Sequence, residues 1–189
     1  MLMKVFPHGT GEGDKPSRYL VRPDYPGRDT APPQVLRGDP AMTRALVDSI
    51  ERRWKFTSGV LSWHPDDKVS EEQEEEVMDA FEQVAFAGLE ADQRNILWVR
   101  HTHAGHHELH FLIPRLELSS GKDFNACPPG WQKDFDVFRD LFNWREGWAR
   151  PDDPARARDE LPKKADLFKA RMARWGKEIR ESDRDRAKE

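Results

Sequence analysis

The sequence predicts an α+β fold in which a central, mainly antiparallel sheet of about five strands is flanked by helices. Three short runs rich in β-branched and aromatic residues indicate strands, at Lys55–Trp63, Ile96–Val99 and Phe111–Ile113. The last two runs flank Ala104 and Gly105, which are typical of a tight connection between antiparallel neighbours. Stretches with apolar residues at helical spacing lie between the strands, so helices and strands contribute to the same fold.

The first part of the chain is expected to contain a strand, a glycine-rich loop and a short helix. Met1–Phe6 is mostly apolar and predicts an edge or first strand, and the loop His8–Gly13 follows it with three glycines. The short helix Pro16–Val21 carries Tyr19, and proline suits its first turn. Tyr25, the second of two tyrosines, lies in a Pro-Asp-Tyr-Pro-Gly turn.

The middle of the chain predicts a brief strand and two helices besides the strand that begins at Lys55. Val35 and Leu36 indicate the brief strand, and Asp39 and Pro40 are typical of the N-cap and first position of a helix. That helix has an apolar stripe of Met42, Ala45, Leu46 and Ile50. A second, acidic helix is expected from about Ser70 to Ala87, with its glutamates as a solvated face. Its expected buried side is Val77, Phe81, Val84 and Ala85.

Beyond the strands, the chain is expected to divide into two parts. Asp123–Ala126 predicts a last short strand, and aromatic residues at helical spacing then predict a packing helix, not a base-stacking platform. These aromatic residues are Trp131, Phe135, Phe138 and Phe142. From Arg150 the chain becomes highly charged. We therefore expect residues 1–149 to form the active domain and residues 150–189 a charged helical tail that is dispensable for activity, compatible with the start of a longer C-terminal region.

Composition limits the classes of protein to be considered. The single cysteine, Cys127, excludes an internal disulfide framework and fits a reducing compartment. No apolar run approaches the length of a membrane helix and no signal-peptide pattern is present, so a soluble, cytoplasmic bacterial protein without membrane insertion is expected. The net charge is −4, but the segment Asp66–Asp92 holds eleven acids and one base, so the other residues sum to +6. An acidic face on a basic remainder is compatible with a polarised DNA-binding protein.

A cluster of histidines between two strands predicts a metal site. It comprises His101, His103, His106, His107, Glu108 and His110. Since side chains alternate along a strand, His101 and His103 are expected to share one face of the first strand, and Glu108 and His110 one face of the second. If the strands pair antiparallel, these faces coincide, and two imidazoles with a carboxylate suit a divalent metal.

The same histidines are also compatible with a solvated loop or an accidental metal-binding tract. Their apolar flanks favour a real site, because they bury the backbone here and buried polar groups need partners. The zinc-protease pattern His-Glu-x-x-His requires a helix. The stretch from His107 to His110 is one residue too short for it and predicts a strand.

Several further segments match a known family in order and spacing. They are the strand and glycine loop before Arg18-Tyr19-Leu20, VLRGDP at 35–40, FTSGVLSW at 56–63, FAGLEADQRNILWVRHTH at 86–103 and HELHFLIPRLELSSGK at 107–122. On these segments, which cover most of residues 1–145, the chain resembles the mobilization relaxases of small colicin-type plasmids. These are single-strand DNA nicking enzymes of the HUH endonuclease superfamily, so the resemblance implies an HUH relaxase-like sheet.

The resemblance also implies roles for individual residues. Tyr19 stands where the family has its nucleophile, and His101, Glu108 and His110 stand at the three metal-ligand positions. The colicin-plasmid branch has asparagine at the third ligand position, whereas most HUH enzymes use three histidines. His103 stands where relatives often have an aspartate; it could orient a ligand, act as base for Tyr19 or be a fourth ligand.

The implied activity is site- and strand-specific nicking of a plasmid transfer origin through a 5′-phosphotyrosyl intermediate, for mobilization in conjugation. The implied cofactor is one divalent ion, Mg²⁺ or Mn²⁺, and the implied partners are single-stranded origin DNA and accessory relaxosome proteins. We predict Arg18, Arg100 and Arg115 as DNA-binding residues. Two other interpretations stay open at this point: a metal-dependent hydrolase without a covalent intermediate, and a non-catalytic DNA-binding domain on the same fold.

Overall fold

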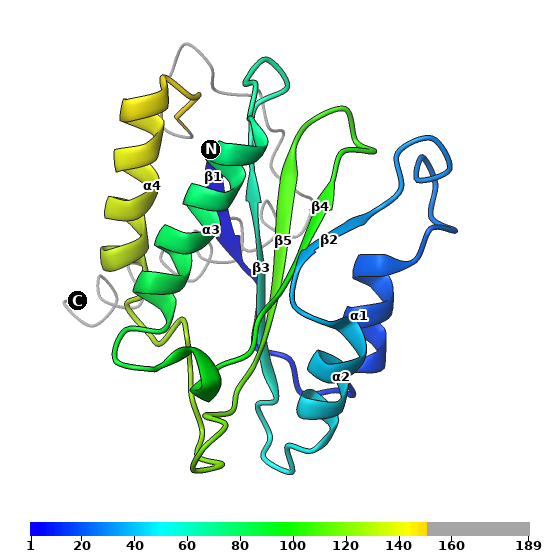
Figure 1. The fold of residues 1–189 in the computed structure, drawn as a ribbon, viewed down its shortest axis with the longest axis vertical. Helices are drawn as coiled ribbons and strands as arrows, with labels where there is room; N and C mark the ends of the chain where they lie inside the picture. The colour runs from blue at the N-terminus through cyan, green and yellow to red at the C-terminus, as the bar shows by residue number, and fades with distance from the viewer. Residues whose placement is uncertain (151–189) are drawn as a thin grey trace, which may run out of the picture. The chain divides into compact units, whose positions relative to one another are not determined.

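A computed structural model describes residues 1–150, which form one α+β unit (Figure 1). The expected tail of residues 150–189 falls almost entirely outside the described residues. The five strands are β1 (Leu2–Val5), β2 (Gln34–Arg37), β3 (Phe56–Ser62), β4 (Leu97–His101) and β5 (Glu108–Pro114). The helices are α1 (Asp14–Val21), α2 (Pro40–Asp48), α3 (Glu71–Ala85), α4 (Gln132–Glu146) and the single 3-10 turn Ala91–Gln93. The predicted α+β class is therefore confirmed. The strand expected at residues 123–126 is wrong, since that stretch has no regular structure.

The sheet is fully antiparallel, with the strand order β1-β3-β5-β4-β2. Its central strand, β5, pairs along its whole length with β3 and over five residues with β4. Gly59 of β3 lies opposite Phe111, and a Cβ there would lie 2.4 Å from the Phe111 ring and 2.5 Å from the Lys4 carbonyl oxygen. A side chain at this position would therefore displace a neighbouring strand or the largest ring of β5.

One face of the sheet carries the main core and is covered by α3 and α4 (Figure 1). Phe81 of α3 is at its centre, because its ring contacts Trp98, Phe111 and Phe135 at centroid distances of 5.0, 4.7 and 5.1 Å. Phe138 of α4 adds a fourth ring at 6.2 Å. Offset and edge-to-face aromatic pairs of this kind add stability beyond the apolar area they bury. The residues after position 130 thus form a packing helix, as the sequence predicts.

The opposite face carries a smaller core under α1 and α2. Leu97 and Val99 of β4 and Leu112 of β5 pack with Leu20 of α1, and all four side chains are buried. α2 begins at Pro40 with Asp39 as its N-cap, whose carboxylate accepts a hydrogen bond of 2.6 Å from the Met42 backbone N–H, as expected. The helix that carries Tyr19 is therefore held over β4 and β5 by few apolar contacts.

The glycine-rich loop before α1 is anchored at both ends. The Gly9 N–H donates to the Phe56 carbonyl oxygen at 3.0 Å, and the Gly13 N–H donates to the Asp48 carboxylate at 2.7 Å. A Cβ on Gly9 would overlap the Phe56 ring. The glycines thus let the backbone pass close to β3 and α2, which fixes where α1 begins.

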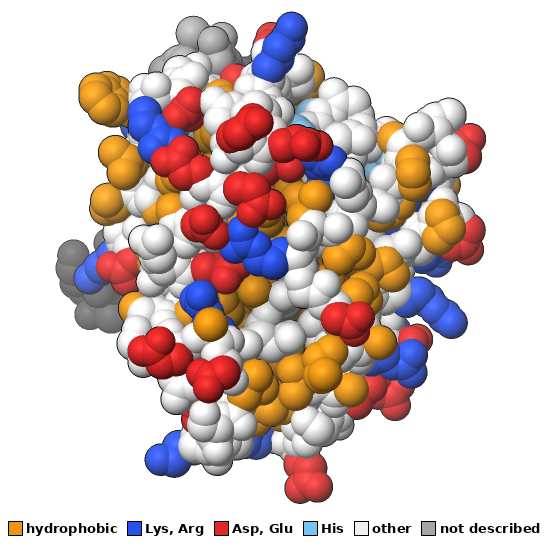
Figure 2. Space-filling view, in the orientation of Figure 1, with side chains coloured by type: hydrophobic (Ala, Val, Ile, Leu, Met, Phe, Trp, Pro, Cys, Tyr) orange, Lys and Arg blue, Asp and Glu red, His pale blue; other side chains and the backbone are white. Residues whose placement is uncertain are grey.

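Four of the six glutamates of the acidic helix α3 are exposed, as expected, but Glu74 and Glu82 are buried, and arginines from neighbouring elements pair with this face (Figure 2). Arg37 of β2 contacts Glu75, Asp79 and Glu82 at 2.5, 2.8 and 2.8 Å. Arg145 of α4 holds Glu76 through two hydrogen bonds of 2.6 Å. These ion pairs fasten α3 to the edge strand β2 and to α4. No helix among residues 1–150 is long and apolar enough to cross a membrane.

The aromatic core predicts that two alanine substitutions lower the free energy of unfolding by very different amounts. Phe81→Ala should lower the free energy of unfolding by about 3–5 kcal/mol, because it removes a fully buried ring with four aromatic neighbours. Leu141→Ala on α4 is the control: this side chain is 55% exposed, and its loss should change stability by no more than about 0.5 kcal/mol. Urea denaturation measures both, and equal costs would contradict the assignment of Phe81 to the centre of the core.

Candidate active site

The strands β4 and β5 bring His101, Glu108 and His110 together on the face covered by α1. His101 is the last residue of β4 and pairs in register with Glu108, the first residue of β5, while Val99 pairs with His110. One potential ligand atom from each of the three residues lies within 4.8 Å of the others. The two imidazole centroids are 4.4 Å apart. The antiparallel register thus assembles the set that the alternation of side chains predicts.

The Glu108 carboxylate is ionised in this setting. Burial alone would raise the pKa of Glu108, but hydrogen bonds and nearby charge from His110 and His106 outweigh burial and lower this pKa to about 2. One carboxylate oxygen lies 3.2 Å from His110 Nε2, and the other lies 3.0 Å from His106 Nε2. An ionised carboxylate is the form that coordinates a metal.

The His101 imidazole is neutral and held on both sides. Only 1% of the residue is exposed, and burial, reinforced by the nearby His110 and Arg28, lowers the pKa of His101 to about 4. His101 Nε2 lies 2.8 Å from the carbonyl oxygen of Leu20, and Nδ1 lies 3.3 Å from Arg28 Nη2. Metal-ligating histidines are neutral and anchored through one nitrogen. In His101 the Leu20 carbonyl oxygen anchors Nε2, and Nδ1 becomes free to bind a cation when the longer contact with Arg28 opens. The donor set therefore fits one divalent cation.

Both tyrosines lie beside this cluster. The Tyr19 ring, on α1, is 6.4 Å from the His101 ring, and 42% of the residue is exposed. The Tyr25 ring lies edge-on to the Tyr19 ring at 5.7 Å and to the His103 ring at 6.0 Å. Tyr19 is thus the tyrosine in contact with a candidate metal ligand, but Tyr25 is closer to the site than its Pro-flanked turn indicates.

His103 lies in the turn after β4, so the expectation that it shares a strand face with His101 is wrong. The loop folds back and places its ring 5.4 Å from the His101 ring. Burial, with a contribution from Arg28, lowers the pKa of His103, and its Nδ1 has no hydrogen-bond partner among the described residues. His107 points to the other side of the sheet, where it forms an ion pair with Glu74 and its ring packs edge-on against Trp63 at 5.2 Å.

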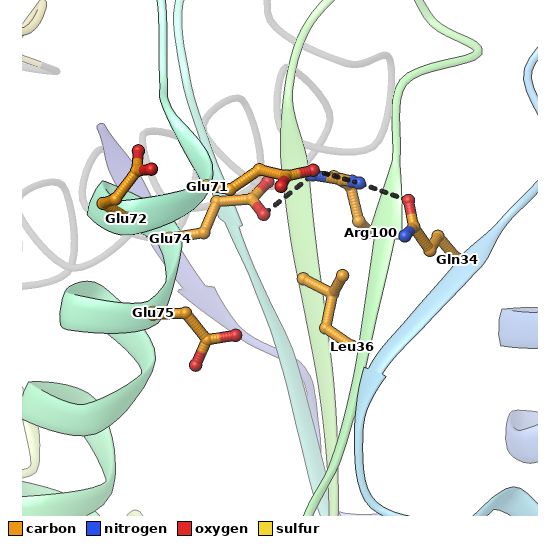
Figure 3. A pocket seen from close by; sticks show the side chains of 7 residues that line it. All are labelled: Gln34, Leu36, Glu71, Glu72, Glu74, Glu75 and Arg100. Carbon is orange, nitrogen blue, oxygen red and sulfur yellow. Dashed lines mark hydrogen bonds and ion pairs between the residues drawn. The ribbon is translucent and has the colours of Figure 1, made fainter.

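The three arginines predicted to bind DNA lie at three different places. Arg100 is on the sheet face opposite to His101, where it borders a cleft of about 330 Å³ lined by Gln34, Leu36, Glu71, Glu72, Glu74 and Glu75 (Figure 3). Its guanidinium is bound by Glu74 at 2.8 Å, by Glu71 at 3.5 Å and by the Gln34 side chain. Arg115 follows the far end of β5 and pairs with Asp123 at 2.7 Å. Only Arg18, exposed on α1 and 4.0 Å from Asp14, is near Tyr19.

Arg28 is the site residue that the sequence does not reveal. Arg28 is 1% exposed. It ends a turn that has Pro26 and Gly27 at its centre, in which the Arg28 N–H donates a 3.0 Å hydrogen bond to the Tyr25 carbonyl oxygen. Gly27 has φ +84°, which this turn requires at its third position. The Pro-Gly pair predicts the turn, but no local pattern predicts that the next side chain points into the protein toward His101.

The matches to known proteins cover the segments that carry this site. Residues 41–143, which include the three candidate ligands, match the MobA/VirD2-like relaxase nuclease domain. The chain is 39% identical over 170 residues to cryptic plasmid protein C of Neisseria gonorrhoeae, covering 88% of this chain and 80% of that protein. It is 34% identical over 168 residues to the DNA relaxase MbeA of Escherichia coli, covering 86% of this chain but only 32% of MbeA, so it spans about a third of that relative. These matches confirm the resemblance to mobilization relaxases, and the chain belongs to the MobA/VirD2-like relaxase family, whose nuclease domain it contains.

Proposed function

We propose that this chain is a metal-dependent relaxase that nicks one strand of a plasmid transfer origin and keeps the cut end on Tyr19. The observation that carries the proposal is the position of the Tyr19 ring, 6.4 Å from the ring of His101 and beside the His101–Glu108–His110 cluster. The name of the relative MbeA, a DNA relaxase, supports DNA as the substrate. A metal-dependent hydrolase would need the cluster but no tyrosine beside it.

The proposed reaction is a transesterification at one phosphodiester. The phenolic oxygen of Tyr19 attacks the phosphorus, the bond from phosphorus to the 3′ oxygen breaks, and the electron pair leaves with that oxygen, which takes up a proton. The result is a 5′-phosphotyrosyl bond, and attack by the 3′ hydroxyl reverses the reaction without any further energy source. A bound divalent ion, Mg²⁺ or Mn²⁺, would polarise the phosphate and stabilise the charge on it.

The phenol of Tyr19 has to lose a proton during the attack, and His103 is the proposed acceptor. Two features support this role: burial lowers the pKa of His103, so the ring is neutral near pH 7, and its Nδ1 lacks a hydrogen-bond partner among residues 1–150. A neutral imidazole with an open lone pair is competent as a general base. The His103 loop would need to bring this nitrogen to the Tyr19 hydroxyl when DNA binds.

We further propose single-stranded origin DNA, accessory relaxosome proteins and the bacterial cytoplasm as the setting for this activity. Arg18 is the DNA-contacting candidate at the site, since it is exposed on the same helix as Tyr19. Arg100 and Arg115 are each bound to carboxylates, so a DNA contact from either would first require an ion pair to open. The tail of residues 150–189 is proposed to be dispensable for cleavage.

The tyrosine assignment is tested by two matched substitutions. Tyr19→Phe should abolish the covalent adduct with a single-stranded origin oligonucleotide, while folding stability changes by no more than about 1 kcal/mol, because only one hydroxyl is lost. Tyr25→Phe removes the same group from the neighbouring ring and should retain adduct formation. A denaturing gel measures the adduct. Normal adduct from Tyr19→Phe, or cleavage without any adduct in the wild type, would favour a plain hydrolase.

The metal assignment is tested at two ligand positions. His101→Ala should reduce nicking by at least 100-fold, because the ligand set loses a buried imidazole on a rigid strand. His110→Asn retains a side chain able to coordinate and should keep activity with an altered preference between Mg²⁺ and Mn²⁺. Nicking assays with and without EDTA provide the measurement, and full activity in excess chelator would exclude the metal role.

The site also predicts acid sensitivity of the metal-free protein. As pH falls from 6.5 toward 4, the unfolded chain protonates His101 while the folded chain does not, so stability should decrease by up to about 3 kcal/mol. Glu108 acts in the same direction at lower pH, between its ordinary pKa of 4.5 and about 2. Urea denaturation at pH 7, 5.5 and 4.5 measures the loss. His101→Gln is the control and should show a shallower decline over this range; an identical slope would contradict the burial of a neutral imidazole.

A further inference from the structure

We propose that Arg28 is a positioning residue that fixes the nucleophile helix α1 against the metal ligand His101. The inference rests on the proposed function of Tyr19. Arg28 is 1% exposed, so water cannot satisfy its guanidinium, and its two terminal nitrogens donate to two separate elements. Those elements are α1, which carries Tyr19, and β4, which ends at His101.

Arg28 caps the C-terminal end of α1. Its Nη1 donates hydrogen bonds of 2.6 Å to the Tyr19 carbonyl oxygen and 3.0 Å to the Arg22 carbonyl oxygen. The last carbonyls of a helix have no partners within the helix, and a positive charge is favourable at that end. α1 has only eight residues and few buried apolar side chains, so this cap adds to the small number of contacts that hold it in place.

The same guanidinium restricts the ring of the nucleophile. The Arg28 guanidinium carbon is 5.0 Å from the centroid of the Tyr19 ring and 4.9 Å from that of the Tyr25 ring. These two rings meet edge-on at 5.7 Å. The Tyr19 ring is therefore held by a cation on one side and an aromatic edge on another, and its remaining ring neighbour is His101 at 6.4 Å.

Arg28 and the Leu20 carbonyl oxygen favour the same tautomer of His101. Arginine can only donate hydrogen bonds, so His101 Nδ1, 3.3 Å from Arg28 Nη2, has to be the acceptor nitrogen. The proton then lies on Nε2, which donates to the Leu20 carbonyl oxygen at 2.8 Å. The lone pair of Nδ1 is occupied by Arg28 in the metal-free protein, so a cation can bind there only when Nη2 moves away. The contact of Nη2 is the longest that Arg28 makes, so it can open while both capping bonds of Nη1 stay in place.

Lysine cannot reproduce this arrangement. The five donors of arginine are fixed in a plane, which lets one side chain cap α1 with Nη1 and reach His101 with Nη2. An ammonium group concentrates its donors on one atom. Arg28→Lys should therefore keep the charge but lose either the cap or the contact with His101.

The first experiment compares Arg28→Gln and Arg28→Lys with Arg22→Gln in full-length protein. Arg22 is the matched control, since it lies on the same segment and pairs with Asp24 instead of reaching His101. At saturating origin oligonucleotide and Mn²⁺, both Arg28 variants should form adduct roughly 10–100-fold more slowly, the range expected for a small misplacement of a reacting group. Arg22→Gln should react at the wild-type rate.

DNA affinity separates positioning from substrate binding. Because Arg28 is buried, the oligonucleotide dissociation constant, measured by fluorescence anisotropy in a Tyr19→Phe background, should stay within about twofold of the unsubstituted value. A large rise in this constant, or an unchanged adduct rate in both Arg28 variants, would overturn the inference. If the wild type forms no adduct, the proposed function fails instead, and the spectroscopic measurement below still tests the contact between Arg28 and His101.

The second experiment does not depend on activity. In metal-free wild-type protein labelled with ¹⁵N in its histidines, the His101 ring should show a protonated Nε2 and an unprotonated Nδ1. The His101→Ala spectrum assigns the signals by their absence. In Arg28→Gln the same tautomer is expected, because the Leu20 carbonyl oxygen still accepts from Nε2, but the Nδ1 resonance should shift because that nitrogen loses its donor Nη2. A wild-type ring protonated on Nδ1 would overturn the inference even if Arg28→Gln fails to fold.

Discussion

The register between β4 and β5 is the constraint on which the site depends. Pairing His101 with Glu108 and Val99 with His110 places the three candidate metal ligands on one face, while Trp98 and Phe111 enter the main core on the other. A slip by one residue would exchange the two faces, exposing aromatic rings and burying charges in an apolar core. The hydrophobic core under α3 therefore specifies the geometry of the polar cluster on the opposite side of the sheet.

The connection between β4 and β5 is fixed from that same core side. Glu74 of α3 is buried between Arg100, the residue before His101, and His107, the residue before Glu108. One carboxylate thus ties down both ends of the loop that carries His103 and His106. The acidic face of α3, which the sequence presents as solvated charge, acts structurally here, because each arginine bound to it comes from another element. Two of its carboxylates, Glu74 and Glu82, are buried and pair with the half-buried Arg100 and Arg37, an arrangement in which losing one partner is costly.

Sequence patterns predict the parts of this protein that depend on local periodicity. The strand alternation around His101 and Glu108, the cap at Asp39 and the aromatic helix after residue 130 all follow from residues close together in the chain. The turn at His103 could not be predicted, since strand periodicity does not reveal where a strand ends. Arg28 and His101 are 73 residues apart, and their contact depends on the placement of α1 over the sheet. Such contacts leave no periodic signal in the sequence. The ion pairs of Arg100 with α3 could not be predicted for the same reason.

One face of the sheet carries most of the apolar core, and the other carries the candidate active site. Burying His101 as a neutral ring and holding Glu108 ionised preorganises ligands, but both choices destabilise the metal-free fold toward acid pH. The small core under α1 has four buried apolar residues and contributes little against this loss, whereas the aromatic core around Phe81 is large. Because both cores lie on the same sheet, the large aromatic core stabilises the strands that carry the candidate ligands. α1 can therefore stay lightly packed. The proposed nucleophile Tyr19 lies on a lightly packed helix, and the buried Arg28 anchors that helix to the candidate ligand His101 without covering Tyr19.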